Sequence, residues 1–117
     1  MKTAHVELSV PAEAAFARSV RMMAANLAVC LDMSVDDVEE VRMAAGEGFV
    51  FSCATEPEAC AIDFTLSDQG ISMDFSLGAA LGDTDELKLA RLLLAAVCDE
   101  FAIDQAAAKL HLMKRIG

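Results

Sequence analysis

The sequence predicts an α/β protein with two layers, in which a mainly antiparallel four-stranded sheet carries three helices on one face. Every expected strand alternates apolar and polar residues, which is the pattern of a sheet with one covered face and one open face. Three longer segments repeat apolar residues at helical spacing, and three helices suffice to cover such a sheet. The 117 residues fit one domain, and 56% of them are hydrophobic, which favours a folded core over disorder.

The first expected elements are a strand at 5–10, where apolar and polar residues alternate, and a helix at 12–31. Pro11 ends the strand and suits the first turn of the helix. The apolar stripe of this helix is formed by Phe16, Val20, Met23, Leu27, Cys30 and Leu31. Arg18 and Arg21 lie off the stripe, so we expect them to be exposed, as an ordinary solvated face or as a contact surface for an acidic partner.

The segment 34–53 is expected to form the central helix. Ser34 is a suitable N-cap residue, and the two aspartates at 36 and 37 place negative charge in the first turn, where the helix dipole favours it. The core-facing stripe is formed by Val38, Val41, Ala45 and Phe49. A second line, at four-residue spacing, is formed by Met43, Glu47 and Phe51. Gly46 and Gly48 flank this line, and since a mid-helix glycine costs about 1 kcal/mol relative to alanine, the pair indicates that something packs closely there.

The carboxylate of Glu47 is therefore expected among apolar side chains, and two interpretations remain open. As a functional group, a mostly buried carboxylate would act as a general base or hold a metal-bound water, because desolvation tunes a carboxyl group for proton transfer. As a structural group, it would lie at the edge of the core and pair with a backbone N–H or an arginine. Periodicity alone favours the structural interpretation, and the rest of the chain must decide.

The second half of the chain is expected to begin with a hairpin. Strands at 61–66 and 71–77 alternate, and the turn at 67–70 consists of polar residues and a glycine. A final strand is expected at 109–116. The residues of these strands that should face the core are Ile62, Phe64, Leu66, Ile71, Met73, Phe75, Leu77, Leu110 and Leu112.

A last helix is expected between the hairpin and the final strand. Asp83 or Thr84 would cap it, and Asp83 and Glu86 are spaced as in a capping box. Its apolar stripe is formed by Leu87, Ala90, Leu94, Val97, Cys98 and Phe101. The segment 104–107 would turn the chain into the final strand.

The open sheet face would carry His5 and His111 among other polar residues. The two histidines could meet on neighbouring strands as a pH-sensitive or metal-binding patch, although ordinary solvated side chains are the favoured interpretation. The four cysteines form no C-x-x-C pair and have no histidine at zinc-ligand spacing, so we expect buried free thiols and no metal site. They are Cys30, Cys53, Cys60 and Cys98.

The net charge of −10 argues against direct nucleic-acid binding, which needs lysine and arginine against phosphates. It is compatible with a basic protein partner, and it also keeps an apolar domain soluble. No apolar run is long enough to span a membrane, and the first residues lack a signal-peptide core. The expectation is a cytoplasmic protein without membrane contact.

The order strand–helix–helix–strand–strand–helix–strand resembles the ATP-binding domain of the GHKL superfamily, and more narrowly the small bacterial anti-sigma factor serine kinases. VRMAAGEGFVFSC resembles the N-box of that family, a helix of the form I-x-L-A-x-x-E-x-x-x-N, and FAR at 16–18 resembles its first helix. LKLARLLLAAVCDEF and AAAKLHLMKRIG resemble its last helix and terminal strand. The resemblance covers residues 4–116 and implies a single truncated GHKL, histidine-kinase-like ATPase domain at 1–117.

The chain departs from this family at the nucleotide site. The N-box asparagine that would hold magnesium falls on Phe51, and a phenyl ring cannot ligate a hard cation. The D-x-G-x-G aspartate that reads adenine is absent around Leu77 and Gly78, and the glycine-rich lid after them is missing. Glu47 matches the glutamate that polarises the attacking group, so the resemblance makes it the catalytic position or its vestige. Phosphoryl transfer depends on positioning and charge neutralisation, which these losses remove.

The resemblance thus implies a pseudokinase: a regulatory protein-binding module with a degenerate ATP site and no cofactor. The implied partner is a sigma factor or an anti-anti-sigma protein, and the resemblance also allows a homodimer of this chain. Arg18 matches the part of the first helix that faces the sigma factor, so it is the expected contact residue. The alternative is a minimal ATP-binding serine/threonine protein kinase that uses ATP and magnesium in a modified site. A pocket lined by Phe51 and Leu77 could also hold a small hydrophobic molecule, unless these side chains fill it.

Overall fold

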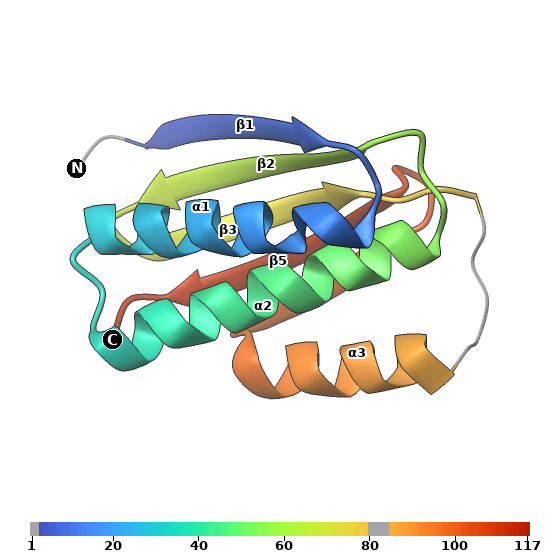
Figure 1. Cartoon of the computed structure of the whole chain (residues 1–117). Helices are drawn as coiled ribbons and strands as arrows, with labels where there is room; N and C mark the ends of the chain where they lie inside the picture. Colours follow the sequence, from blue (N-terminus) through green and yellow to red (C-terminus); the bar gives the residue numbers. More distant parts are fainter. Residues whose placement is uncertain (1–2, 80–84) are drawn as a thin grey trace.

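The computed structural model describes residues 3–79 and 85–117, and the backbone alone at residue 86. Within these residues, five strands and three α-helices follow one another, with a short 3-10 helix before the first α-helix (Figure 1). The order is β1 (Ala4–Val10), η1 (Ala14–Phe16), α1 (Ala17–Cys30), α2 (Val35–Ala54), β2 (Cys60–Ser67), β3 (Gly70–Ser76), α3 (Asp85–Val97), β4 (Glu100–Asp104) and β5 (Lys109–Arg115).

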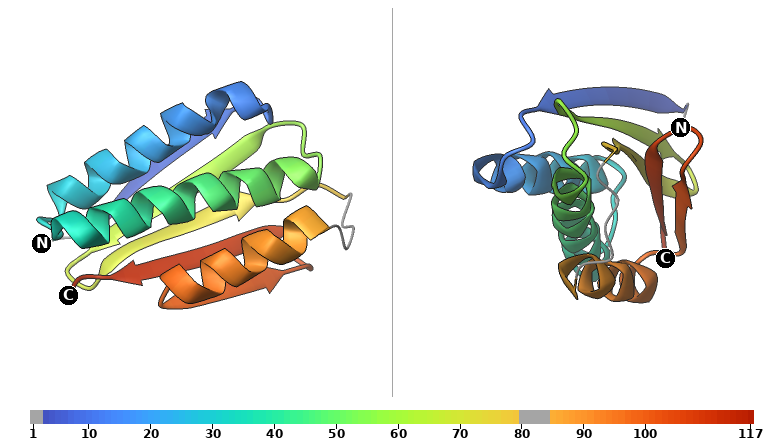
Figure 2. Two further views of the ribbon diagram at one scale, coloured as in Figure 1. Left: turned by 60° about the horizontal axis from the view of Figure 1, so that its bottom comes forward. Right: turned by 90° about the vertical axis from the view of Figure 1, so that its right-hand side faces the viewer.

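The strands form one sheet in the order β1-β2-β3-β5-β4, and every neighbouring pair is antiparallel. All three helices lie on one face of this sheet (Figure 2). The expected α/β architecture with helices on one face of an antiparallel sheet is confirmed. The expected number of four strands is wrong, because β4 adds a fifth strand at the edge beside β5.

The missed strand lies in the segment that was expected to continue the last helix. The helix α3 ends at Val97, and Phe101 lies on β4, paired with Leu112 of β5. Apolar residues at 97, 98 and 101 fit a helical stripe as well as the end of a helix followed by a strand. The five residues of β4 are too few to establish an alternating pattern against that stripe. The expected turn follows β4 and leads into β5.

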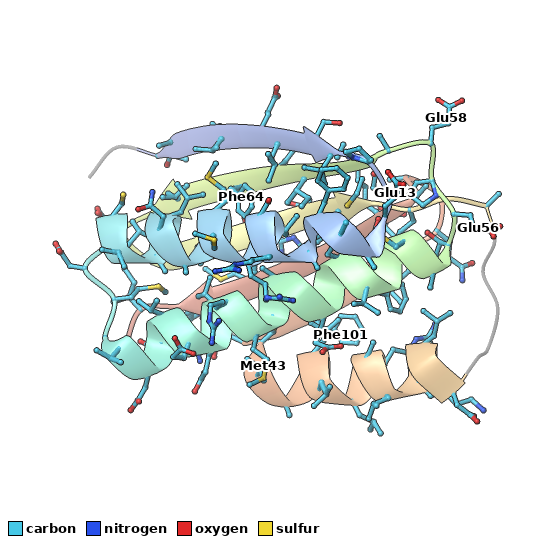
Figure 3. All side chains as sticks on the ribbon, in the orientation of Figure 1. Glu13, Met43, Glu56, Glu58, Phe64 and Phe101 are labelled. Atoms are coloured by element: carbon cyan, nitrogen blue, oxygen red, sulfur yellow. The ribbon has the colours of Figure 1, made fainter. Side chains whose placement is uncertain are left out.

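The core lies between the sheet and the helical layer. Val41, Ala45 and Phe49 of α2 are buried in it, as their spacing predicted, and Val38 packs against its edge. Phe64 from β2 and Phe101 from β4 point from the sheet into this layer (Figure 3). The strand residues expected to face inward are buried, namely Ile62, Phe64, Leu66, Ile71, Met73, Phe75, Leu77, Leu110 and Leu112.

Local signals in the sequence are confirmed at two places. The Ser34 hydroxyl caps α2 by accepting a hydrogen bond of 3.1 Å from the Asp37 backbone N–H. The β2–β3 hairpin turns at residues 68 and 69, and Gly70 follows with a φ of 151°. A Cβ at Gly70 would lie 2.2 Å from the Lys114 carbonyl oxygen, so only glycine fits there. The expected caps of α3, Asp83 and Thr84, lie outside the described residues.

Gly46 and Gly48 allow two close approaches to α2, as their position in the helix predicted. A Cβ added at Gly48 would lie 2.7 Å from the Phe75 ring and 3.1 Å from a methyl group of Leu112. A Cβ added at Gly46 would lie 2.9 Å from Cδ of Arg21 on α1. Gly48 therefore sets the distance between α2 and the sheet, whereas Gly46 lets a flexible side chain from α1 cross the helix.

We expect the two glycines to respond differently to alanine. Gly48→Ala should lower the free energy of unfolding by about 1–3 kcal/mol, because the new methyl group overlaps an aromatic ring held inside the core. Gly46→Ala is the matched control: the Arg21 stem can move aside, so stability should stay the same or rise by up to about 1 kcal/mol through helix propensity. Urea unfolding of both variants measures the difference, and equal losses would contradict the assignment.

Candidate functional site

The positions that the resemblance assigns to a nucleotide pocket are packed. The Phe51 side chain is fully buried on α2, and the guanidinium carbon of Arg91 on α3 lies 5.9 Å from the centre of its ring. This distance suits a cation–π contact. Leu77 is only 8% exposed at the end of β3. Of the two possibilities for this region, the structure therefore favours a filled pocket over a cavity for a small hydrophobic molecule.

Hydrogen bonds close the same region on its polar side. The buried Ser52 hydroxyl donates to the Ser76 carbonyl oxygen at 2.6 Å. The buried Thr55 hydroxyl donates to the Ser52 carbonyl oxygen at 2.6 Å and accepts from the Gly78 backbone N–H at 2.7 Å. A Cβ at Gly78 would lie 2.1 Å from the Thr55 carbonyl oxygen, so glycine is required for this contact. These polar groups hold the chain after β3 against the end of α2.

Glu47 lies elsewhere, on the outer surface of α2. It is half-buried and lines an open groove of about 390 Å³ together with Arg21, Glu39, Arg42, Met43, Gly46 and Val50. The expectation of apolar surroundings for Glu47 is wrong, because α2 turns this position toward α1, where two arginines and Glu39 line the groove with it. Met43, from the same line, is 49% exposed and projects outward from α2 (Figure 3). Phe51 alone of that line enters the core.

Two further hollows continue this groove along the seam between α1 and α2. One, of about 450 Å³, is lined by Arg18, Arg21, Met22 and Arg42, and it shares two arginines with the Glu47 groove. The other, of about 290 Å³, shares Val50 with it. It is lined by Ala14, Ala17, Phe49, Val50, Cys53 and Ala54. We call the three together the α1–α2 groove: its arginine end and middle are polar, and its far end is apolar.

The arginines of the groove differ in their contacts. Arg42 donates to the Glu39 carboxylate at 2.7 Å, and because both side chains are about half exposed, this pair contributes little to stability. Within the described part of the chain, Arg18 and Arg21 form no ion pair. The Arg21 stem rests against Gly46, which positions its guanidinium in the middle of the groove.

The sequence predicted some of these residues and missed the rest. Arg18 was expected on the surface as a partner contact, and it is exposed. Arg21 was expected to be exposed as well, and it is half-buried because its stem crosses Gly46. Arg42 was not predicted. Its place beside Arg21 follows from the pairing of α1 with α2, which run antiparallel (Figure 1), and no local pattern encodes that pairing.

The two histidines of the open sheet face do not meet. His5 is on β1 and His111 on β5, with β2 and β3 between them, which excludes the less favoured alternative of a shared patch. His5 lies 3.3 Å from the Thr65 hydroxyl. Nδ1 of His111 lies 2.8 Å from the Asp74 carboxylate, and Nε2 lies 3.3 Å from the Glu100 carboxylate. Among the described residues, no group of three or more histidine, cysteine or acidic side chains is placed to hold a metal ion.

The four cysteines are free thiols, as expected, but they are not all buried. Cys60 is buried, whereas Cys30 is exposed at the end of α1, which corrects its assignment to the apolar stripe. Burial, and then the neighbouring Cys60, raise the pKa of Cys53 to about 11. Burial raises the pKa of Cys98 to about 11 as well. Both thiols therefore stay protonated and uncharged near neutral pH.

Comparison of the chain with protein-family models gives no match, and comparison with curated proteins gives no significant one. None of the helices in the described part of the chain combines the length and the apolar character that crossing a membrane requires. The functional inference consequently depends on the residues quoted above and on the geometry of the α1–α2 groove.

We expect His111 to make stability depend on pH. Burial acts to lower its pKa, but the hydrogen bonds and charges of Asp74 and Glu100 outweigh burial and raise the pKa above the ordinary 6.5. Because the folded pKa is the higher one, the stabilisation is fully present below pH 6.5 and is lost as the pH rises through the folded pKa. On the same face, Lys109 lies 3.9 Å from the Asp63 carboxylate, and Arg115 donates to the Glu100 carboxylate at 3.1 Å.

Urea unfolding of the wild type and His111→Gln at several pH values measures this effect. The stability difference between the two proteins should shrink from mildly acidic to mildly alkaline pH. His5→Gln is the control, since His5 has no carboxylate partner among the described residues. A difference that stays constant with pH would contradict the prediction.

Proposed function

We propose that this chain is a regulatory protein-binding module that resembles an anti-sigma factor kinase in fold and has a degenerate ATP site. The observed element order keeps the sequence of strands and helices on which the resemblance rests and adds one strand at the sheet edge. The observation that carries the proposal is the complete burial of Phe51 at the position where the family holds magnesium. Its ring packs beneath the Arg91 guanidinium and offers no oxygen ligand to an ion, which supports the proposal.

The chemistry of the surrounding residues supports this assignment. Magnesium binds oxygen ligands at short, octahedral distances, and a phenyl ring provides none. The hydroxyl groups closest in sequence, on Ser52 and Thr55, are already used to hold the backbone at 76–78. Transfer of a phosphoryl group needs several charges around the phosphates. The contacts of α2 with α3 and with the end of β3 support a structural role for this region.

The partner surface of the proposed module is the α1–α2 groove. Arg18, the residue that the resemblance assigns to the sigma factor contact, is exposed at this groove beside Arg21 and Arg42. The proposed partners are a sigma factor or an anti-anti-sigma protein, and a homodimer is compatible with the same fold. No cofactor is required for this role.

A second candidate function is a minimal serine/threonine protein kinase that binds ATP and magnesium in a modified site. The observation that favours it is the position of Glu47 in an open groove beside two guanidinium groups, of Arg21 and Arg42. A carboxylate base and cationic side chains are among the groups that phosphoryl transfer uses. Phe51 is buried and does not line this groove, so this site would differ from that of the family.

Nucleotide binding separates the two candidates. A nucleotide that binds the folded state must raise the melting temperature. With a degenerate site, thermal unfolding should therefore show the same melting temperature with and without millimolar ATP or ADP, in the presence or absence of magnesium. A magnesium-dependent rise that Glu47→Ala abolishes would contradict the leading proposal and favour the kinase. Phe51→Asn tests whether restoring an oxygen ligand is sufficient to restore binding.

Affinity purification from the source cells tests the partner. The wild-type chain should recover a sigma factor or an anti-anti-sigma protein, and Arg18→Glu should recover less of it, because the substitution reverses a charge at the groove. Lys88→Glu changes the net charge equally at an exposed position on α3 and should behave like the wild type. Recovery of no transcription or signalling protein, with equal behaviour of wild type and Arg18→Glu, would remove the support for this function.

A further inference from the structure

We propose that the α1–α2 groove binds a segment of the partner that carries acidic side chains at one end and a bulky apolar side chain at the other. This inference rests on the proposed protein-binding function and specifies the chemistry of what the groove accepts. It follows from three features: a concentration of arginines, an adjoining apolar hollow, and the continuity between them.

The arginine end is suited to carboxylates. Three of the nine lysine and arginine residues of a chain with net charge −10 line two connected hollows there. Glu39 and Glu47 offset part of this charge, yet three arginines and two glutamates leave the groove positive. Among the described residues, Arg18 and Arg21 form no ion pair, and both line the outer hollow. A guanidinium binds a carboxylate through two parallel hydrogen bonds.

The far end of the groove is suited to an apolar anchor. Ala14, Ala17 and Ala54 have side chains too small to fill the space above the buried Phe49, which leaves the hollow of about 290 Å³. Cys53 adds a thiol that stays neutral near pH 7, because burial raises its pKa to about 11. The lining thus carries no charge, and a leucine or phenylalanine side chain entering it would lose water from apolar surface on both sides.

Continuity between the two ends identifies the occupant as a protein segment. Val50 lines both the apolar hollow and the Glu47 groove, and Arg21 lines both the Glu47 groove and the outer arginine hollow. A small anion would use only one end. A nucleic acid would meet the repulsion of a protein with net charge −10. A peptide segment with an apolar anchor and neighbouring carboxylates can use the whole groove, as amphipathic segments do in other recognition grooves.

A peptide library tests this inference with the full chain. Linear random peptides displayed on phage are selected against the wild type, and the strongest binder is synthesised with a fluorescent label for anisotropy titration. The selected peptides should be enriched in aspartate or glutamate beside one large apolar residue. Binding should weaken roughly tenfold in Arg42→Glu and in Ala14→Phe, which fills the hollow from an exposed position, and it should weaken with added salt.

Lys88→Glu is the charge-matched control and should bind the peptide as the wild type does. Arg42→Lys should retain part of the affinity, because lysine keeps the charge but cannot form the two parallel hydrogen bonds. Selection of basic peptides, or equal weakening by Arg42→Glu and Lys88→Glu, would overturn the inference. Concentration-dependent dimerisation that Arg42→Glu abolishes would overturn it in favour of a second copy as occupant.

The two proposals fail in different ways. Peptides that obey these rules, together with purified partners unrelated to transcription, would support the groove and refute the regulatory function. A transcription regulator whose binding is unchanged in both Arg42→Glu and Ala14→Phe would support the function and refute the groove.

Discussion

The close contact between α2 and the middle of the sheet is the constraint on which the rest of the structure depends. Gly48 lies against the Phe75 ring and a methyl group of Leu112, so the helix axis can approach β3 and β5 closely. Both ends of α2 are then attached to the same strands. Glu40 pairs with Lys114 of β5 near the helix N-terminus, a contact that raises the pKa of the lysine, and Ser52 bonds the end of β3. The helix is thereby fixed in distance and in rotation.

The rotation of α2 decides which side chains are available for function. It directs Phe51 into the core beneath Arg91, and it directs Glu47 to the seam with α1. Gly46 on the same turn provides the path for the Arg21 stem. One helix thus buries Phe51, the position that the resemblance assigns to a metal ligand, and builds the middle of an open groove. Both features are consequences of a single packing arrangement.

Most of the fold could be predicted from the sequence because its signals are local. The alternation of β2 and β3, the cap at Ser34 and the paired glycines of α2 each act within a few residues. The failures have a different cause. The edge strand β4 is short and partly exposed, so its residues fit a helical stripe equally well. Glu47 was expected to face the same way as Met43 and Phe51, because the three residues are spaced four apart. Residues four apart on a helix still differ somewhat in direction, and at this seam the difference leaves Met43 in solvent and Phe51 in the core, with Glu47 between them.

The groove could be predicted even less, since it exists only after α1 and α2 have packed. Arg18 could be selected by resemblance, whereas the arrangement of Arg21, Arg42 and the small residues at 14, 17 and 54 depends on contacts between elements distant in the sequence. The same arrangement gives the charge of the molecule two separate roles. Charges on both partners act over only about 8 Å at physiological salt. Within that range the net charge of −10 favours a basic protein as a whole, whereas the arginines of the groove act on the segment that docks against them. A basic partner with an acidic segment can pair its basic surface with the acidic surface of this chain and its carboxylates with the groove arginines in one orientation only. Other orientations bring like charges together, and charge patterns select a docking geometry in this way.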